Sequence, residues 1–328
     1  MVHNETWFNC DDGTQLFLHR WLPGLAGTSP SKPAAVLHIV HGMAEHGLRY
    51  QRLADKLTAN NIEVWAADQR GHGKTADTGI NNPGKGGLLG HCADVKGFDR
   101  VSADVHAINC AIRKTYPDIP IVLMGHSWGS FISQNYIEKY GDAGIINGCI
   151  LSGTRGPGGI VVKAGLPLMR LFALFCGKRK GSEAARAIAD GPYSKPFKPN
   201  RTPFDWLSRD EEQVDAYIED PKCGMLCSTG FYRDMVGGLN RIHRKDAMAA
   251  ISQELPIYVV CGSNDPVGDM GVSPTALVNK YRSLGIKDLE FVQYPGARHE
   301  ILNETNREEV MENILSWINR HYGLSAGE

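Results

Sequence analysis

Uniformly apolar runs alternate with amphipathic stretches along most of the chain. The apolar runs before residue 153 are 34–40, 62–67, 121–124 and 149–151. Runs of this kind are typical of strands that are buried on both faces of a parallel sheet. Residues 50–57 and 98–112 place apolar side chains at helical spacing between them. This alternation predicts an α/β fold, in which a doubly wound, mostly parallel sheet carries helices on both faces and binds ligands at the carboxyl ends of its strands.

Both ends of the chain extend this pattern. Residues 6–10 and 15–21 flank Asp11-Asp12-Gly13, which predicts a hairpin and therefore an antiparallel edge to the sheet. Strand-like runs return at 256–261 and 289–294, and helical patterns follow them at 277–284 and 310–318. We therefore expect the C-terminal part to complete the same sheet.

The alternation is interrupted for about eighty residues after Gly153. We predict core at 1–153, a mainly helical cap insertion at 154–237 and core again at 238–328. The most apolar part of the insertion, 159–176, is broken by charged residues and a proline and is too short for a comfortable membrane span. Later in the insertion, prolines interleave with Tyr193, Phe204 and Trp206, which indicates an irregular connection that packs aromatic rings onto another surface.

Two interpretations of the apolar insertion segment stay open. Its side chains either pack the cap onto the core, or line an acyl pocket and contact a lipid surface beside the basic residues 178–180. The residues expected to bind substrate under the second interpretation are Leu166, Met169, Phe172 and Phe175.

Composition and charge limit the kinds of partner that the protein is expected to bind. The 328 residues are 42% hydrophobic and 22% charged, with a formal net charge of −1. These values are ordinary for a globular protein and give no bias toward nucleic acid, so we expect a neutral small-molecule partner. The first residues lack the pattern of a secretory signal, and the eight cysteines are scattered, which suits reduced thiols. We therefore expect a cytoplasmic protein without a metal site.

The stretch Gly125–Gly129 reads G-x-S-x-G and follows an apolar run. This is the pattern of a nucleophile elbow, in which flanking glycines permit a tight strand-to-helix turn that exposes the serine hydroxyl. Because a serine hydroxyl is a poor nucleophile alone, Ser127 requires a histidine base and a carboxylate later in the chain.

Both partners are present in the required order. Asp265 follows the apolar run 256–261, and His299 follows the run 289–294. Since the carboxyl ends of parallel strands share one edge of the sheet, we expect Ser127, Asp265 and His299 to meet there as a catalytic triad. Asp269, four residues further on, is the alternative carboxylate.

An acyl-transfer site also needs donors for the oxyanion. We expect the backbone amide of Trp128, which follows the nucleophile, and that of Met43, in the loop after the run 34–40. Glu45 in the same loop is expected to brace it.

Five motifs carry a family resemblance. In chain order they are HGMAEHG (41–47), DQRGHGKT (68–75), GHSWGS (125–130), GSNDPV (262–267) and GARHE (296–300). The chain resembles the monoacylglycerol lipase and lysophospholipase-like branch of the α/β-hydrolase superfamily. The resemblance implies an eight-stranded core, a cap inserted after the sixth strand, no cofactor, and ester hydrolysis through an acyl-enzyme. It also implies the triad and oxyanion roles given above.

One residue departs from this branch. Trp128 stands where its lipases more usually have methionine, and GHSWGS is similar to the elbow of proline iminopeptidases. Those peptidases usually carry HGGPG where this chain has HGMAEHG, which favours the lipase side. The expected function is hydrolysis of single-chain lipid esters or small acyl esters, with transient contact of the cap with a membrane or micelle. The alternatives are an aminopeptidase or amidase with the same triad, and a non-catalytic ligand-binding member of the fold.

Overall fold

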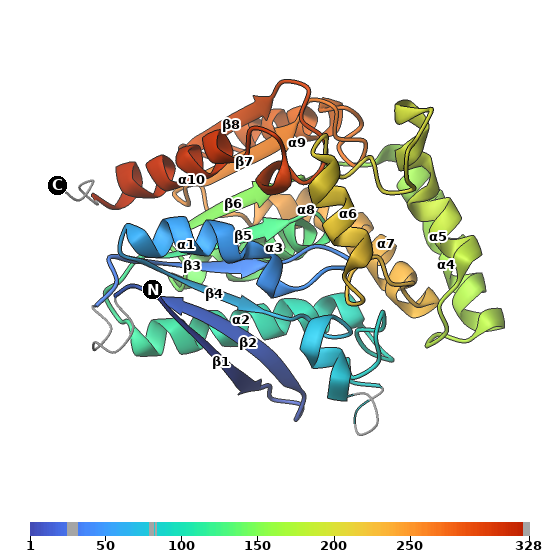
Figure 1. Cartoon of the computed structure of the whole chain (residues 1–328), viewed down its shortest axis with the longest axis horizontal. Helices are drawn as coiled ribbons and strands as arrows, with labels where there is room; N and C mark the ends of the chain where they lie inside the picture. The colour runs from blue at the N-terminus through green and yellow to red at the C-terminus, as the bar shows by residue number, and fades with distance from the viewer. Residues whose placement is uncertain (25–31, 79–81, 83, 324–328) are drawn as a thin grey trace.

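The computed structural model describes residues 1–24, 32–78, 82 and 84–323. Within them the chain forms one eight-stranded sheet, in the order β1-β2-β4-β3-β5-β6-β7-β8 (Figure 1). The strands are β1 (Val2–Asn9), β2 (Gln15–Leu22), β3 (Ala35–Val40), β4 (Ile62–Ala67), β5 (Ile121–His126), β6 (Gly148–Ser152), β7 (Ile257–Gly262) and β8 (Leu289–Tyr294). β2 pairs antiparallel with both of its neighbours, and the other pairings are parallel. The predicted fold class is confirmed.

The central strands are buried on both faces. Every residue of β3, β4, β5, β6 and β7 is buried. The sheet has a hydrophobic core on each face. Successive side chains of one strand pack into opposite cores, because they point to opposite faces of the sheet. In β3, Val36 and Val40 pack into one core cluster, and Leu37 and Ile39 pack into the other.

Helices cover both faces of the sheet. α1 (Gln51–Ala59) and α10 (Arg307–Tyr322) pack on the face of Leu37. α2 (Gly97–Thr115), α3 (Trp128–Tyr140) and α9 (Val272–Ser283) pack on the face of Val36. The 3-10 helices are η1 (Gly47–Tyr50), η2 (Gly73–Thr78), η3 (Gly141–Ala143), η4 (Gly191–Phe197) and η5 (Ile301–Asn303).

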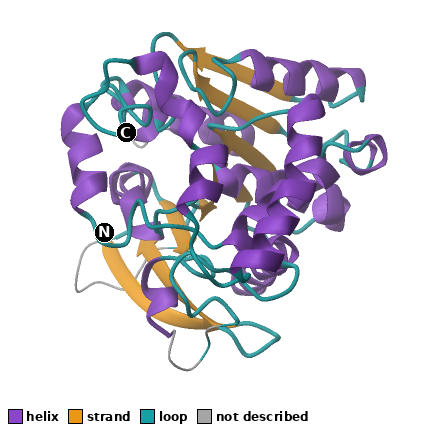
Figure 2. Cartoon of the chain, turned by 90° about the vertical axis from the view of Figure 1, so that its right-hand side faces the viewer, coloured by secondary structure: helices purple, strands orange, loops and turns teal. Residues whose placement is uncertain are grey.

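The segment between β6 and β7 is mostly helical. It contains α4 (Gly159–Cys176), α5 (Glu183–Ala189), α6 (Glu211–Glu219), α7 (Thr229–Ile242) and α8 (Lys245–Ala249). α7 contacts α4 on one side and the core helices α2 and α3 on the other. We use the name cap for residues 154–242, because the predicted boundary at 237 falls inside α7. Figure 2 looks onto the cap helices from the right-hand side of Figure 1.

Side-chain caps explain where the shorter cap helices begin. The Ser182 hydroxyl accepts the Ala185 N–H at 3.1 Å before α5, and the Ser228 hydroxyl accepts the Phe231 N–H at 3.1 Å at the start of α7. Asp210 caps α6 in the same way. Along the described residues, no helix is both long enough and apolar enough to cross a membrane.

Candidate active site

Ser127 lies in a strained turn between β5 and α3. Its backbone has φ 52° and ψ −123°, a region that non-glycine residues rarely adopt. The Ser127 N–H donates to the Ser152 carbonyl at 2.9 Å, which fixes the turn to β6. A Cβ at Gly125 would collide with the carbonyl oxygen of Gly129, so the turn requires glycine there. The elbow that the motif predicts is therefore formed, and Ser127 lies at the carboxyl end of β5.

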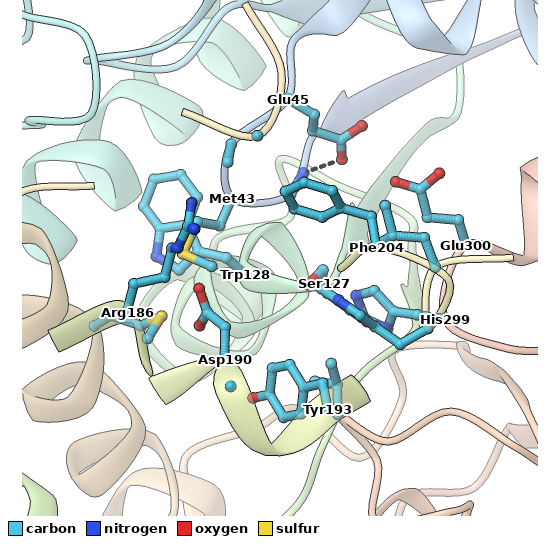
Figure 3. Close-up of a pocket in the computed structure, with 18 of the residues that line it drawn as sticks. Met43, Glu45, Ser127, Trp128, Arg186, Asp190, Tyr193, Phe204, His299 and Glu300 are labelled. Carbon is cyan, nitrogen blue, oxygen red and sulfur yellow. Dashed lines mark hydrogen bonds between the residues drawn. The ribbon is translucent and has the colours of Figure 1, made fainter. Parts of the chain in front are cut away.

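Asp265 and His299 form a hydrogen-bonded pair on neighbouring loops. His299 Nδ1 lies 2.9 Å from Asp265 Oδ1, and the same oxygen accepts the Val267 N–H at 2.9 Å. Both side chains are buried. Because a carboxylate only accepts, the proton of the neutral imidazole lies on Nδ1, and Nε2 keeps its lone pair. Nε2 has no hydrogen-bond partner among the described residues, and Figure 3 shows the ring beside Ser127.

Asp269, the alternative carboxylate, lies elsewhere. It is exposed and forms an ion pair with Arg155 at 3.1 Å. Among the two acids, the structure therefore brings Asp265 to the histidine.

The environment of His299 favours its protonated form. Burial on its own lowers the pKa of His299, but the charge and hydrogen bond of Asp265 outweigh burial, with smaller contributions from Glu300 and Glu45. The net result is a pKa of His299 above its ordinary value. A histidine in this setting holds a transferred proton more readily than a free imidazole does.

The loop after β3 passes close to Ser127. A Cβ at Gly42 would lie 3.1 Å from the Cβ of Ser127, and the Gly42 N–H already donates to Glu45 Oε1 at 2.6 Å. The next amide along the loop belongs to Met43. Met43 and Trp128 both line the cavity above Ser127, where the sequence places the oxyanion donors.

Buried charges brace this loop. Arg49 contacts Glu45 Oε2 and both oxygens of Glu300, each at 2.7 Å. The Tyr50 hydroxyl donates to Glu45 Oε1 at 2.9 Å. The bracing role expected of Glu45 is thus present, and its pKa is lowered: burial opposes the shift, but the charge of Arg49, the neighbouring histidines and the Gly42 hydrogen bond together outweigh it. The sequence alone did not reveal the roles of Arg49 and Glu300, although Glu300 is the last residue of the GARHE motif and Arg49 lies two residues after HGMAEHG.

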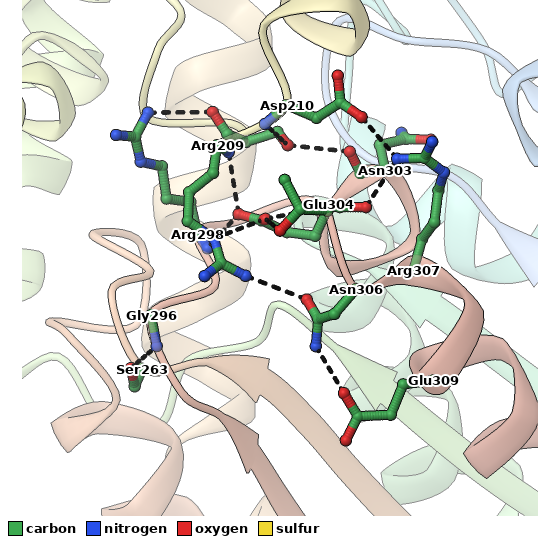
Figure 4. Close-up of polar contacts among 12 residues, drawn as sticks. Arg209, Asp210, Ser263, Gly296, Arg298, Asn303, Glu304, Asn306, Arg307 and Glu309 are labelled. Carbon is green, nitrogen blue, oxygen red and sulfur yellow. Dashed lines mark hydrogen bonds and ion pairs between the residues drawn. The ribbon is translucent and has the colours of Figure 1, made fainter.

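A second network fixes the loops of Asp265 and His299 (Figure 4). The Ser263 hydroxyl accepts the Gly296 N–H at 2.8 Å, which joins the two loops directly. The carboxylate of Glu304 accepts the backbone N–H groups of Arg298 at 2.8 Å and Arg209 at 3.0 Å. Since Arg209 belongs to the cap, the cap and the His299 loop are held by one carboxylate.

The cap and core enclose a cavity of about 310 Å³ over Ser127. Most of its walls are aromatic or aliphatic, as is usual for ligand sites, but the charged residues Glu45, Arg155, Glu183, Arg186, Asp190 and Glu300 also contribute to the lining. Trp206 stacks 5.2 Å from the His299 ring, and Tyr193 lies 5.1 Å from Trp206. Other apolar side chains of the lining are Phe131, Phe204, Leu207, Tyr217, Met225, Tyr232, Met235, Leu239 and Val267. The irregular aromatic connection therefore packs onto the site.

The substrate-binding residues expected from the sequence are not in this lining. Met169 is buried in the core, and Phe172 is half-buried against it. Leu166 lies beside a separate surface groove of α2 and α7, and Phe175 is 80% exposed. The structure therefore does not bring these four residues into the cavity over Ser127, and their expected contact with substrate stays a prediction.

Three groups of side chains among the described residues have the elements of a metal site, each with ligand atoms within 4.8 Å of one another. They are His3, Glu5 and His19; Asp288, Glu290 and His321; and His46, Asp220 and Cys223, the last of which contains a thiol. His46 Nε2 already lies 2.8 Å from Asp220 Oδ2, and burial raises the pKa of the Cys223 thiol. Thiolate is the form that binds metals, so this environment disfavours one.

Comparison with known proteins identifies the family. The model of the family described as serine aminopeptidase, S33, matches residues 31–306. The chain belongs to this family. It is 29% identical to the monoacylglycerol lipase of Mycolicibacterium smegmatis over 297 residues, which cover 90% of this chain and 91% of that protein. It is 28% identical to the monoglyceride lipase of Mus musculus over 328 residues, covering 96% and 90% of the two chains.

Solved structures of this hydrolase type agree with the fold. A thermostable carboxyl esterase from Bacillus coagulans, in complex with glycerol, superposes with a TM-score of 0.86 at 28% identity, covering 98% of this chain and 99% of that one. A soluble variant of monoglyceride lipase from Saccharomyces cerevisiae gives a TM-score of 0.73 at 22% identity, covering 98% and 96%. The predicted resemblance is confirmed. This member of the serine aminopeptidase S33 family is a monoacylglycerol lipase-like α/β-hydrolase.

Proposed function

We propose that the protein is a serine esterase that hydrolyses single-chain acyl esters, of the monoacylglycerol or lysophospholipid type, through an acyl-enzyme. The observation that carries the proposal is the unpaired Nε2 of His299 beside Ser127, at the floor of a largely apolar cavity. A nucleophile, an oriented base and an enclosed apolar site are the elements that acyl transfer requires.

In the first half-reaction, His299 Nε2 takes the hydroxyl proton of Ser127 while Oγ attacks the ester carbonyl carbon. The amides of Met43 and Trp128 donate to the oxyanion. As the tetrahedral intermediate collapses, the C–O bond of the alcohol breaks, and His299 returns the proton to the alcohol oxygen. A water molecule then repeats the sequence on the acyl-enzyme and releases the acid and free Ser127.

The size of the cavity limits the acyl group. Its volume of about 310 Å³ lies near the lower end of the ~300–1,000 Å³ that is usual for small-ligand pockets. A site of this size suits one acyl chain of short to medium length. Longer chains then extend through the opening of the cavity.

An exposed apolar face of α4 supports contact with a lipid surface. Leu168, Leu171 and Leu174 recur at helical spacing and are 39%, 51% and 74% exposed, and Phe175 beside them is 80% exposed. The basic residues 178–180 follow after two further residues, and there Lys178 and Arg179 also pair with Asp94 at 3.6 and 2.6 Å. A contiguous apolar face next to basic residues is suited to an interfacial position on lipid.

Hydrolysis of p-nitrophenyl esters from acetate to palmitate tests the proposal, with monoacylglycerol, lysophosphatidylcholine and a proline arylamide assayed in parallel. We expect ester turnover that peaks at medium chain length and is lost in Ser127→Ala. Cleavage of the arylamide alone would instead support the aminopeptidase that the family's description names. No turnover of any substrate would favour the non-catalytic alternative.

A further inference from the structure

The cavity contains a carboxylate that the proposed mechanism does not use. Asp190, at the end of α5, lines the cavity wall, and its Oδ2 accepts the hydroxyl proton of Tyr232 at 3.1 Å. No other described side chain forms a hydrogen bond with this carboxylate. Arg186, one turn earlier on α5, forms its ion pair with Glu183 at 3.2 Å. Figure 3 shows the Asp190 carboxylate facing the cavity below Trp128 and Arg186.

The rings around the cavity place Asp190 relative to the reacting ester. Tyr232, its partner, lies 5.9 Å from Phe231, and Phe231 lies 5.0 Å from Trp128. In the proposed mechanism the amide of Trp128 donates to the oxyanion. The leaving alcohol must lie beside His299, because His299 returns the proton to the alcohol oxygen. Figure 3 shows Asp190 on the Trp128 side of Ser127, with His299 on the opposite side. The acyl part of the ester therefore extends toward Asp190.

We propose that Asp190, held by Tyr232, recognises a hydroxyl group on the acyl part of the substrate, so that esters of hydroxylated medium-length acids are preferred. This inference rests on the proposed function. A plain hydrocarbon chain would displace water from the carboxylate without replacing its hydrogen bond. Tyr232 would still bond Oδ2, but Oδ1 would be left without a partner in a half-buried site, which costs free energy, so the site discriminates against the analogue that lacks the hydroxyl.

A hydroxyl group can bind Asp190 in either protonation state. Burial raises the pKa of Asp190 to about 7, against the lowering effects of the Tyr232 hydrogen bond and the charge of Arg186. Both forms of the carboxyl group are then populated near neutral pH. A hydroxyl donates to the carboxylate and accepts from the carboxylic acid, whereas an ammonium group pairs with the carboxylate alone.

The test compares p-nitrophenyl octanoate with analogues that carry a hydroxyl at carbon 3, 6 or 8. The readout is the ratio of kcat/KM for each hydroxyoctanoate to that for octanoate, because partial misfolding lowers both rates equally. For the wild type we expect a ratio of about 10 at the carbon that reaches Asp190, the factor that one net hydrogen bond to a charged group supplies. Asp190→Leu should bring this ratio to 1 or below.

Two further variants keep the test decisive if Asp190→Leu does not fold. Tyr232→Phe removes the hydroxyl that orients Asp190 and should lower the ratio several-fold. Asp246→Leu makes the matched change at an exposed carboxylate, which pairs with Arg244 at 2.9 Å, and should keep the wild-type ratio.

Several results would overturn the inference. The first is a wild-type ratio of 1 or below for the hydroxyl at every carbon. The second is a ratio that Asp190→Leu leaves unchanged or, if that variant does not fold, that Tyr232→Phe leaves unchanged. The third is a stronger preference of the wild type for 6- or 8-aminooctanoate than for the hydroxyoctanoates. Failure of the proposed function is distinguishable, since octanoate and all of its analogues would then stay uncleaved.

Discussion

The backbone N–H of Arg298 donates to the carboxylate of Glu304 at 2.8 Å. Arg298 directly precedes His299 in the chain, so this hydrogen bond holds the backbone beside the imidazole. Glu304 is fully buried, and its carboxylate also holds the side chain of Arg209 at 2.8 Å. Beside it, the Glu300 N–H donates to the Leu207 carbonyl of the cap at 2.7 Å. The position of the His299 imidazole is thus set jointly by the loop after β8 and by the cap.

Glu304→Ala should lower both stability and turnover. The change leaves the N–H groups of Arg298 and Arg209 without their acceptor, which costs about 1–3 kcal/mol for each buried donor. We expect the free energy of unfolding in urea to fall by about 3 kcal/mol, and kcat to fall more than KM changes. Glu304→Gln keeps one acceptor oxygen and should lose less than half as much. Equal losses in the two variants would contradict this account.

Asp265→Asn should change the pH profile as well as the rate. The base acts only as neutral imidazole, so activity falls as pH drops through the pKa of His299, which Asp265 holds above its ordinary value. Asparagine lacks the negative charge of Asp265, while burial still lowers the pKa of His299. The acid limb of the kcat/KM profile should therefore move to lower pH. We expect kcat to fall by about 10⁴-fold, as the orienting partner is lost. A limb that stays in place would show that Asp265 does not act on His299.

Gly42→Ala should impair catalysis through the oxyanion loop. The added Cβ would lie 2.8 Å from Glu45 Oε1 and 3.1 Å from the Cβ of Ser127, so the loop must shift. Displacing one oxyanion donor costs about 10²-fold in kcat, and we expect a loss of this order with a small change in KM. Gly141→Ala is the matched control, because its Cβ would have no contact closer than 3.8 Å and should leave kcat unchanged.

The exposed face of α4 predicts a membrane phenotype. Leu174→Ser together with Phe175→Ser should lower binding to phosphatidylcholine vesicles by about 10-fold or more, since each buried apolar side chain contributes about 1.5–3 kcal/mol and insertion is partial. Sedimentation with vesicles measures the bound fraction. Val272→Ser, at a residue 69% exposed on α9, is the control. Equal binding by all three proteins would place the lipid contact elsewhere or show that there is none.

The sheet and the positions of the reacting residues follow from local sequence signals. Strands such as β3 and β5 are buried along their whole length, so their apolar runs stand out, and Ser127 is marked by glycines that its turn requires. The lining of the cavity carries no such signal. Met169 is 2% exposed and Phe175 is 80% exposed on the same apolar helix, because the neighbours of α4 decide which side is buried. Asp190 reaches the site only through the packing of α5 against α7.

The central claim is that Ser127 is the nucleophile, and covalent labelling tests it most directly. The protein would be incubated with an alkyl fluorophosphonate and analysed by intact mass and peptide mapping. The account predicts one adduct, located on Ser127, that is absent in Ser127→Ala and forms far more slowly in His299→Ala. An adduct on another residue, or wild-type ester hydrolysis by Ser127→Ala, would contradict it.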